Sequence, residues 1–249
     1  MNKNSIILII QARMQSTRFP NKAIADLCGA PLIERVFQRI KRVKGIDGII
    51  LATTKSKEDD ILDKIANSNK IEVFRGSEND VIDRFYKAAK VKNVNHIIRM
   101  CADNPIPEPS EYERLIKYHL DSNNDFSSNT QDFLGNGYPN GIGTEIFTFK
   151  SLEKIWKREK RETFREHISL NYFDYTKQEV NPKFNFKIGT INCPKEMSRP
   201  GLKLDVNYHE QYLFIKEIYE NLFTKNKEFT VKEVIEWYDK KQSKDQKKL

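Results

Sequence analysis

Continuous apolar runs alternate along this chain with segments in which apolar residues recur every three or four positions. Residues 5–10 form an apolar run rich in β-branched residues, which predicts a central strand buried on both faces. From Pro31 to Val43 the apolar residues follow helical spacing, and Pro31 suits the first helical position because its missing N–H would lack a partner there. Gly45 ends the helix, and residues 48–54 predict a second strand.

The same alternation continues through the first 130 residues. Helices are predicted at 59–67 and 81–91, and strands at 71–74 and 96–101. Strands that alternate with helices of this length form parallel β-α-β units with right-handed crossovers. The sequence therefore predicts an α/β fold with a mostly parallel, doubly wound sheet and helices on both faces.

The alternation breaks after Asn129, where glycine and proline cluster between residues 135 and 143 and indicate a long loop. Beyond the loop we expect strands at 144–149 and 184–191, helices at 152–160 and 163–175, a return to the sheet at 202–205, and closing helices at 211–223 and 231–238. We therefore expect one domain over residues 1–249, with a substrate-side excursion at about 133–200.

Composition narrows the class of protein. Hydrophobic residues make up 38% and charged residues 31% of the chain, which suits a water-soluble domain with a buried core. No apolar run approaches the roughly 20 residues of a membrane-spanning helix, and the first residues lack a signal-peptide pattern. Cys28, Cys101 and Cys193 lie far apart, which favours reduced thiols over disulfides or a zinc site. We expect a cytoplasmic protein without membrane contact.

The formal net charge of +8 leaves the type of partner open. The cations are spread over most predicted helices, whereas a nucleic-acid-binding protein concentrates them, interleaved with aromatic residues, on one element. The single dense run is a tail at 240–249, which we expect to be frayed and solvated; it contains Lys240, Lys241, Lys244, Lys247 and Lys248. A basic chain also suits an anionic small-molecule substrate.

The candidate chemistry lies just after the predicted strands, where open parallel sheets bind ligands. Arg13, Arg18 and Lys22 follow the first strand within ten residues, with Ser16 and Thr17 between them. Guanidinium groups and backbone N–H groups of such a loop can bind a nucleoside triphosphate and stabilise a departing pyrophosphate. A solvated basic loop is the competing interpretation. We call residues 11–22 the basic loop.

The basic loop resembles the opening signature A-R-x-x-S-x-R-x-P-x-K of the cytidylyltransferase family, which includes 3-deoxy-manno-octulosonate, acylneuraminate and spore-coat polysaccharide cytidylyltransferases. The resemblance implies a Rossmann-like nucleotide-diphospho-sugar transferase fold. It also implies transfer of CMP from CTP to a sugar, sugar acid, or sugar or polyol phosphate in surface polysaccharide or glycoconjugate biosynthesis, with release of pyrophosphate. The implied nucleotide contacts in the basic loop are Gln11, Ala12, Arg13, Ser16, Arg18 and Lys22. Arg13, Arg18 and Lys22, together with Asp103, are the implied catalytic residues.

Residues 74–85 resemble the segment that approaches the cytosine in this family, and are most similar to the spore-coat subgroup. The resemblance implies nucleotide contacts by Arg75 and Ser77, because a Gly-Ser turn at a strand end lets backbone groups approach a base edge. Asp83 and Arg84 follow on the next helix. Exposure on the helix surface or an ion pair accounts for these two residues equally well.

Two acidic positions resemble the magnesium ligands of the family. Residues 99–105 are similar to its G-D-x-P element, which places Asp103 as a Mg²⁺ ligand, although Ala102 replaces the usual glycine. Residues 202–207 resemble the second acidic element, with Asp205 as the other ligand. Two carboxylates suit Mg²⁺, which takes its remaining ligands from water and phosphate. Alternatively, Asp103 starts a turn, and Asp205 or Asn207 caps the next helix; we expect Asn207 to be the cap.

The excursion is expected to bind the acceptor. Residues 138–141, 143–147 and 165–167 resemble the Y-P-x-G, x-E-V/I-F and R-E-H elements of the spore-coat subgroup. The implied acceptor contacts are Glu145, Arg165 and His167, although a structural role explains His167 as well. Arg199 and Lys203 are further candidate anion contacts. The family resemblance also implies a homodimer formed through the excursion.

Two other functions fit parts of the sequence. A glycosyltransferase of related fold would use an acidic pair for its metal and a nucleotide-sugar donor, but would not need three cations after the first strand. A basic nucleic-acid-binding protein would show salt-dependent binding through the tail. The arrangement of the cations favours CTP and a small sugar-like acceptor as partners.

Overall fold

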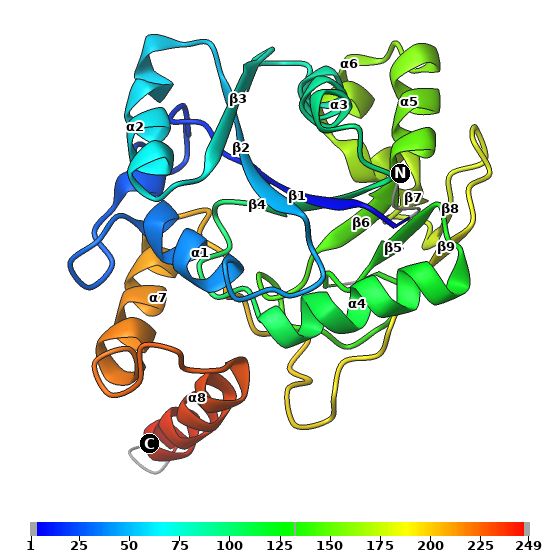
Figure 1. Cartoon of the computed structure of the whole chain (residues 1–249). Helices are drawn as coiled ribbons and strands as arrows, with labels where there is room; N and C mark the ends of the chain where they lie inside the picture. Colours follow the sequence, from blue (N-terminus) through cyan, green and yellow to red (C-terminus); the bar gives the residue numbers. More distant parts are fainter. Residues whose placement is uncertain (1–3, 132, 247–249) are drawn as a thin grey trace.

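The computed structural model describes residues 4–131 and 133–246, and its centre is a seven-stranded sheet (Figure 1). The strand order is β3-β2-β1-β4-β6-β5-β9. The bounds are β1 Ile6–Gln11, β2 Gly48–Thr54, β3 Glu72–Gly76, β4 His96–Cys101, β5 Phe126–Ser128, β6 Glu145–Thr148 and β9 Ile188–Gly189. A separate small hairpin joins β7 (Phe173–Asp174) to β8 (Glu179–Val180).

The sheet is mostly parallel, as predicted. β1 pairs in parallel with both β2 and β4, and β2 pairs in parallel with β3. The chain therefore moves outward from β1 to β3 and then returns to the other side of β1. This reversal places a topological switch point between β1 and β4, where doubly wound sheets bind their ligands. β6 runs antiparallel to β4 and β5, which the sequence pattern did not reveal.

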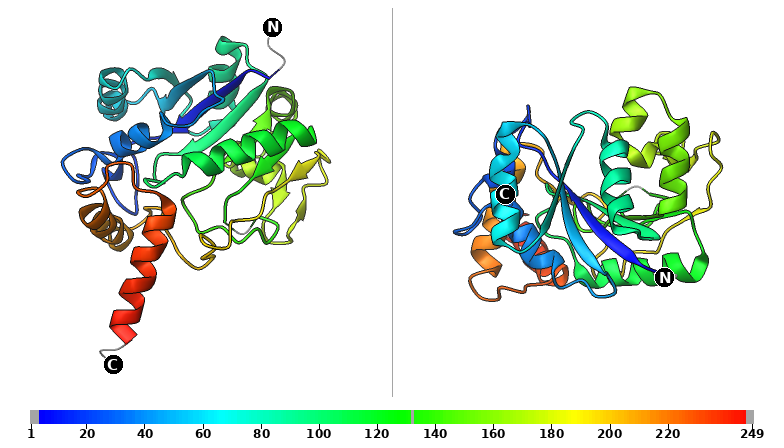
Figure 2. Two further views of the ribbon diagram at one scale, coloured as in Figure 1. Left: turned by 60° about the horizontal axis from the view of Figure 1, so that its bottom comes forward. Right: turned by 45° about the horizontal axis from the view of Figure 1, so that its top comes forward.

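Alternate side chains of β1 enter two different cores, because successive residues of a strand point to opposite faces. Leu8 packs with α1, α4 and α7, whereas Ile7 and Ile9 pack with α3 and α5 (Figures 1 and 2). The α-helices are α1 Leu32–Ile40, α2 Asp60–Ser68, α3 Val81–Lys92, α4 Pro109–Ser122, α5 Phe149–Arg158, α6 Glu162–Glu166, α7 His209–Leu222 and α8 Val231–Gln246. The 3₁₀ turns are Lys22–Ile24, Lys57–Asp59 and Ile168–Asn171.

The excursion departs most from the prediction. The expected helix at 163–175 is wrong, since α6 ends at Glu166 and the chain continues through a 3₁₀ turn into the β7–β8 hairpin. Asn171 Nδ2 donates to the carbonyls of Phe164 (2.8 Å) and Ile168 (3.1 Å) and so satisfies backbone groups that a longer helix would have used. Tyr172 and Phe173 are fully buried in an aromatic cluster, and this burial overrides the helical spacing.

The strand at 202–205 and helix α4 also differ from the prediction. The segment 202–205 makes one isolated bridge, between Asn140 and Lys203, and is no strand of the main sheet. The excursion itself supplies β6 and β9 to that sheet. Helix α4 was not predicted, although Pro109 at its start and buried residues at 112, 115, 116 and 119 carry the helical spacing. The three nearby prolines had indicated a turn.

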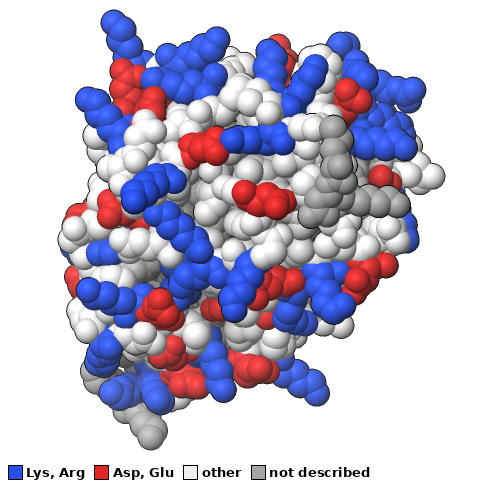
Figure 3. All heavy atoms as spheres, viewed as in Figure 1, with Lys and Arg blue, Asp and Glu red and all other residues white. Residues whose placement is uncertain are grey.

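The basic tail is helical as far as it is described. α8 continues to Gln246, and the ammonium group of Lys241 forms an ion pair with Glu217 on α7. Residues 240–246 therefore extend a helix and are not frayed, while Lys247 and Lys248 lie outside the described residues. Figure 2 shows α8 extending away from the sheet, and Figure 3 shows Lys and Arg interspersed with Asp and Glu. None of the helices in the described ranges has the length and apolarity needed to cross a bilayer.

Candidate functional site

A cavity of about 390 Å³ opens at the carboxyl ends of β1 and β4, at the switch point of the sheet. The basic loop supplies most of its lining, and Ala23, Arg99, Cys101–Asp103, Glu166 and His167 supply the rest. The residues predicted to contact the nucleotide from the basic loop, together with Asp103, all line the cavity: Gln11, Ala12, Arg13, Ser16, Arg18, Lys22 and Asp103. Their contacts with the nucleotide stay predictions. Cys101 is a free thiol at the cavity wall, and burial raises its pKa to about 11, so it remains protonated at neutral pH.

Asp59 holds the basic loop against the end of β2 through hydrogen bonds. One of its carboxylate oxygens accepts the backbone N–H of Met14 at 2.7 Å. The other accepts hydrogen bonds from the hydroxyls of Thr53 (3.0 Å) and Thr54 (2.5 Å) at the end of β2. Burial raises the pKa of Asp59, but the hydrogen bonds from Thr54, Met14 and Thr53 lower it by more, so the net shift is downward. The sequence analysis assigned Asp59 only to a helix and missed this function.

Lys22 connects the basic loop to both acidic segments. Its ammonium group lies 2.9 Å from Asp103 Oδ2 and donates to the carbonyl of Val206 at 3.0 Å. The N–H of Val206 in turn donates to the carbonyl of Asp103 at 2.8 Å. Three segments that are far apart in the sequence therefore meet around one cation.

Arg18 reaches the second acidic segment through Asn207. The Arg18 Nη2 donates to Asn207 Oδ1 at 2.8 Å, and the Asn207 amide donates to the Asp205 carboxylate. The prediction that Asn207 caps α7 is wrong, because its side chain bridges Arg18 and Asp205. The start of α7 is stabilised instead by the Gln211 side chain, whose oxygen accepts the N–H groups of Asn207 (2.7 Å) and Tyr208 (3.0 Å).

Asp205 forms no ion pair within 4.0 Å in the described part of the chain, although the charges of Lys203 and Lys22 act on it from farther away. Its side chain is buried, and Oδ1 has no hydrogen-bond partner among the described residues. Burial is the largest cause of the raised pKa of Asp205; the negative charge of Asp103 raises it further, and the charges of Lys203 and Lys22 offset part of this repulsion. A divalent cation would relieve this repulsion. The described residues contain no group of three or more His, Cys, Asp or Glu that could hold a metal ion. Mg²⁺ commonly takes one or two carboxylates and completes its shell with water and phosphate oxygens. These residues fit Mg²⁺.

Gly141 explains how the Y-P-x-G element positions Asp205. Its φ is +89°, and a Cβ there would lie 2.6 Å from the carbonyl carbon of Leu204. The close approach lets Asn140 donate to the Leu202 carbonyl (2.9 Å) and accept from the Leu204 N–H (3.0 Å). Only glycine permits this contact. The element therefore holds the segment that carries Asp205 against the loop before β6.

The comparisons agree with this geometry. The family model described as Cytidylyltransferase matches residues 7–244. The chain belongs to the cytidylyltransferase family. It is 30% identical over 222 residues to the spore coat polysaccharide biosynthesis protein SpsF of Bacillus subtilis, covering 87% of each chain. It is 34% identical over 235 residues to the uncharacterized protein MJ1063 of Methanocaldococcus jannaschii, covering 94% of this chain and 90% of that protein.

A solved structure confirms the fold as well. A cytidylyltransferase from Leptospira borgpetersenii superposes with a TM-score of 0.83 at 26% identity, covering 97% of this chain and 95% of that chain. The chain is therefore a CTP-dependent nucleotidyltransferase with a Rossmann-like fold, as the sequence predicted. The alternative of a basic nucleic-acid-binding protein finds no support in these relatives.

The structure does not bring the predicted cytosine contacts of this cytidylyltransferase into the cavity. The guanidinium of Arg75 donates to the Thr54 carbonyl (2.8 Å), the Ser56 carbonyl (2.6 Å) and Asp60 Oδ1 (2.6 Å). The Ser77 hydroxyl accepts the N–H of Asp80 at 3.1 Å. Arg75 thus joins β3 to the β2–α2 connection. Its contact with the nucleotide, and that of Ser77, stay predictions.

Arg84, for which a surface position or an ion pair had been considered, is neither exposed nor paired with an acid in the described part of the chain. It is buried, and its Nη1 donates to the Ser77 carbonyl at 2.5 Å. Burial lowers its pKa to about 10, and the charge of Arg13 contributes. Its neighbour Asp83 accepts a hydrogen bond from Trp156 Nε1 at 2.9 Å and pairs with Lys87. Through its hydrogen bond to the Ser77 carbonyl, Arg84 therefore stabilises the turn at Gly76–Ser77.

The three residues predicted to contact the acceptor, Glu145, Arg165 and His167, lie in different positions relative to the cavity. Arg165 lies outside the cavity lining, and its Nε and Nη2 each lie 2.7 Å from the Asp80 carboxylate at the start of α3. Glu145 is buried behind the wall and forms a 2.8 Å ion pair with Arg99, which does line the cavity. His167 lines the cavity directly. The sequence analysis missed its neighbour Glu166, which lines the cavity and lies 3.5 Å from Arg13.

Two further candidates also lie away from the cavity lining. Arg199 pairs with Asp239 on α8, with its Nε 3.2 Å from the carboxylate. Lys203 lies in the bridge to Asn140. The expectation that either contacts an anion has no support from these positions.

Proposed function

We propose that this cytidylyltransferase transfers CMP from CTP to an oxygen atom of a sugar, sugar acid, or sugar or polyol phosphate, within the cavity at the switch point. The supporting observation is that the cations of the basic loop and Asp103 line one cavity, and that Asn207 links Arg18 to the buried carboxylate of Asp205. The cations match the triphosphate, and the carboxylates match a magnesium ion bound to it.

The basic loop would bind and orient the triphosphate. An acceptor oxygen attacks the α-phosphorus, and the bond from that phosphorus to the oxygen bridging the β-phosphorus breaks, which releases pyrophosphate. Arg13, Arg18 and Lys22 would hold the β- and γ-phosphates and stabilise the charge that builds on the leaving group. Arg18 and Lys22 are already positioned by Asn207 and Asp103, which reduces the reorganisation needed during the reaction.

Asp103 and Asp205 would hold Mg²⁺, which when bound neutralises phosphate charge and polarises the phosphorus–oxygen bonds. The unpartnered oxygen of Asp205 supports its assignment as a ligand. Lys22 limits the negative charge on Asp103 until the metal and nucleotide bind. The side chains then need to move little, since Val206 ties the two acidic segments together.

The acceptor would lie on the α6 side of the cavity. His167 and Glu166 line the cavity there, Glu166 beside Arg13 of the basic loop, and can hydrogen-bond hydroxyl groups of a sugar. The relationship to a spore coat polysaccharide biosynthesis protein supports an acceptor destined for a surface polysaccharide. We also infer a homodimer formed through the excursion and a cytoplasmic site of action; sedimentation and cell fractionation test these two points.

A pyrophosphate-release assay tests the proposed function. The enzyme with Mg²⁺ is supplied with CTP, ATP, GTP or UTP against a panel of sugar acids, sugar phosphates and polyol phosphates. We expect release with CTP and one class of acceptor, and far slower release with the other nucleotides. Equal use of all four nucleotides would contradict the assignment. Turnover that requires a nucleotide-sugar in place of CTP would instead support a glycosyltransferase.

A further inference from the structure

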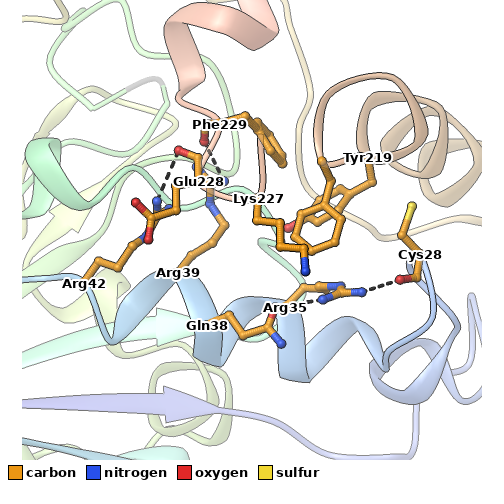
Figure 4. Close-up of a pocket in the computed structure, with 10 residues that line it drawn as sticks. Cys28, Arg35, Gln38, Arg39, Arg42, Tyr219, Lys227, Glu228 and Phe229 are labelled. Carbon is orange, nitrogen blue, oxygen red and sulfur yellow. Dashed lines mark hydrogen bonds between the residues drawn. The ribbon is translucent and has the colours of Figure 1, made fainter. Parts of the chain in front are cut away.

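A second cavity, of about 430 Å³, lies between α1 and the connection from α7 to α8, and shares no lining residue with the first (Figure 4). Arg35 and Arg39 line it from α1, where their spacing of four residues places them on one face, and Arg42 lines it from the turn just after the helix. Lys227 approaches from the opposite connection. Glu228 is the one acidic residue among those that line it. The cavity is therefore strongly cationic.

The three arginines donate to backbone carbonyl groups, which leave their charges uncompensated. Arg35 Nε donates to the Leu27 carbonyl at 2.8 Å. Arg39 donates to the carbonyls of Pro107 (3.0 Å) and Phe229 (2.9 Å), and Arg42 donates to that of Glu228 at 3.2 Å. Among the described residues, the one carboxylate that comes within 4.0 Å of these guanidinium groups belongs to Glu108, which lies at that limit from Arg39.

Two donor atoms at this cavity also lack partners in the described part of the chain. Arg39 is 3% exposed, yet its Nη2 makes no hydrogen bond there. The Nε of Arg42 is likewise buried without a partner. Burial lowers the pKa of Arg39, which reflects the cost of holding a buried charge that Glu108 offsets only in part. An anion in the cavity would offset this cost.

Aromatic rings hold two of the guanidinium groups in place. The Cζ of Arg35 lies 4.2 Å from the centre of the Phe223 ring, and that of Arg39 lies 4.6 Å from the Phe229 ring. Stacked guanidinium groups lose little conformational freedom when they bind a ligand, and their planar forks match phosphate oxygens. The volume lies within the range of small-molecule sites, about 300–1,000 Å³. Size, charge and rigidity all suit a small phosphate-bearing ligand.

We propose that this cavity binds a small phosphorylated anion, with Arg35, Arg42 and Lys227 contacting the phosphate. The site is separate from the proposed nucleotide site and does not depend on the function assigned there. It also lies against the segment that carries Asp103. Tyr219, in its wall, donates from its hydroxyl to the Pro105 carbonyl at 2.7 Å, and Arg39 donates to the Pro107 carbonyl.

Calorimetric titration of an Arg18→Ala, Lys22→Ala variant tests the proposal, because this variant weakens phosphate binding at the first cavity. The probes are inorganic pyrophosphate, glucose 6-phosphate and CMP. We expect saturable binding of at least one probe with a stoichiometry of one per chain. Tighter binding of pyrophosphate would identify an inorganic phosphate ligand. Tighter binding of glucose 6-phosphate or CMP would show that the sugar or nucleoside also contacts the cavity.

Adding Arg42→Ala and Lys227→Ala to that variant should weaken binding by about tenfold or more, since each removes a charged hydrogen-bond donor. Both side chains are partly or fully exposed, so the fold should persist, which circular dichroism checks. The matched control adds Arg158→Ala and Lys225→Ala, two exposed cations outside the cavity. It removes the same charge and should change affinity by less than about twofold. Absence of saturable binding, or equal weakening by both pairs, would overturn the proposal.

Discussion

The two sides of the proposed nucleotide cavity use their charged residues differently. On the side of the basic loop, Lys22 and Arg18 reach across to Asp103 and Asn207 and still line open space. On the side of the excursion, Arg165 is bound by Asp80 and by the carbonyls of Trp156 (3.1 Å) and Glu159 (2.7 Å). Both sides carry motifs of the family. The basic loop faces the ligand space, whereas the R-E-H element is divided: Glu166 and His167 line the cavity, and Arg165 supports the fold.

The difference follows from how each segment is attached to the sheet. The basic loop and Asp103 directly follow β1 and β4, and adjacent parallel strands deliver their carboxyl ends to one edge. Arg165 lies on a short helix whose orientation depends on tertiary packing. A residue just after a central parallel strand is therefore placed at the ligand space by strand order, whereas on the short helix packing turns Arg165 away while Glu166 and His167 line the cavity.

The largest effect is expected from Asp103→Asn. Losing this carboxylate should reduce turnover by about 10³-fold or more, because a charge-stabilising group at the reacting phosphate is removed. The melting temperature should change little, since the side chain is partly exposed at a strand end. Pyrophosphate release and thermal unfolding measure the two quantities. Near-normal activity with Mg²⁺ would place the metal site elsewhere.

Arg18→Ala and Lys22→Ala should each lower turnover by about 10²–10³-fold, the usual result of removing a preorganised contact to developing charge. Arg18→Lys should restore only part of the loss, because an ammonium group cannot reproduce a bidentate fork. Lys41→Ala, an exposed residue just after α1, is the control and should be nearly silent. If Arg18 and Lys22 behave like Lys41, the basic loop is only a solvated turn.

Arg165→Ala tests whether the ion pair between Arg165 and Asp80 supports the fold and not the acceptor. We expect a loss of about 2–3 kcal/mol in the free energy of unfolding, because partly buried Asp80 loses its charged partner. Turnover measured well below the melting temperature should remain close to that of the parent enzyme. Chemical denaturation and steady-state kinetics separate the two effects. A large rise in KM for the acceptor with unchanged stability would show that Arg165 binds the acceptor after all.

The smallest effect concerns Asp59 and the support of the basic loop. Its folded-state pKa lies below the unfolded value of about 3.9, so its stabilisation is present above about pH 4 and is lost as the pH falls further. Relative to Asp59→Asn, the parent enzyme should be more stable by about 1–2 kcal/mol at pH 7. Urea unfolding between pH 7 and pH 3 should show this advantage shrinking below pH 4. An advantage that is constant with pH would contradict the assigned ionisation.

The sequence by itself determined the central sheet and the basic side of the site. The strands at 48–54 and 96–101 have the predicted bounds, because buried parallel strands require uninterrupted apolar runs. The positions of Arg18, Lys22 and Asp103 followed from the same pattern, since each lies within a loop directly after a central strand. Their meeting is a consequence of strand order and needs no detail of side-chain packing.

Only the tertiary structure decided the roles of Asn207, Arg75 and Arg165. Each has a long or polar side chain with several possible partners within reach, and packing selects among partners that are remote in sequence. The segment 163–175 shows the same principle for the backbone. Its helical spacing was outweighed by burial of Tyr172 and Phe173 in the aromatic cluster, because apolar area removed from water contributes more free energy than local helix propensity.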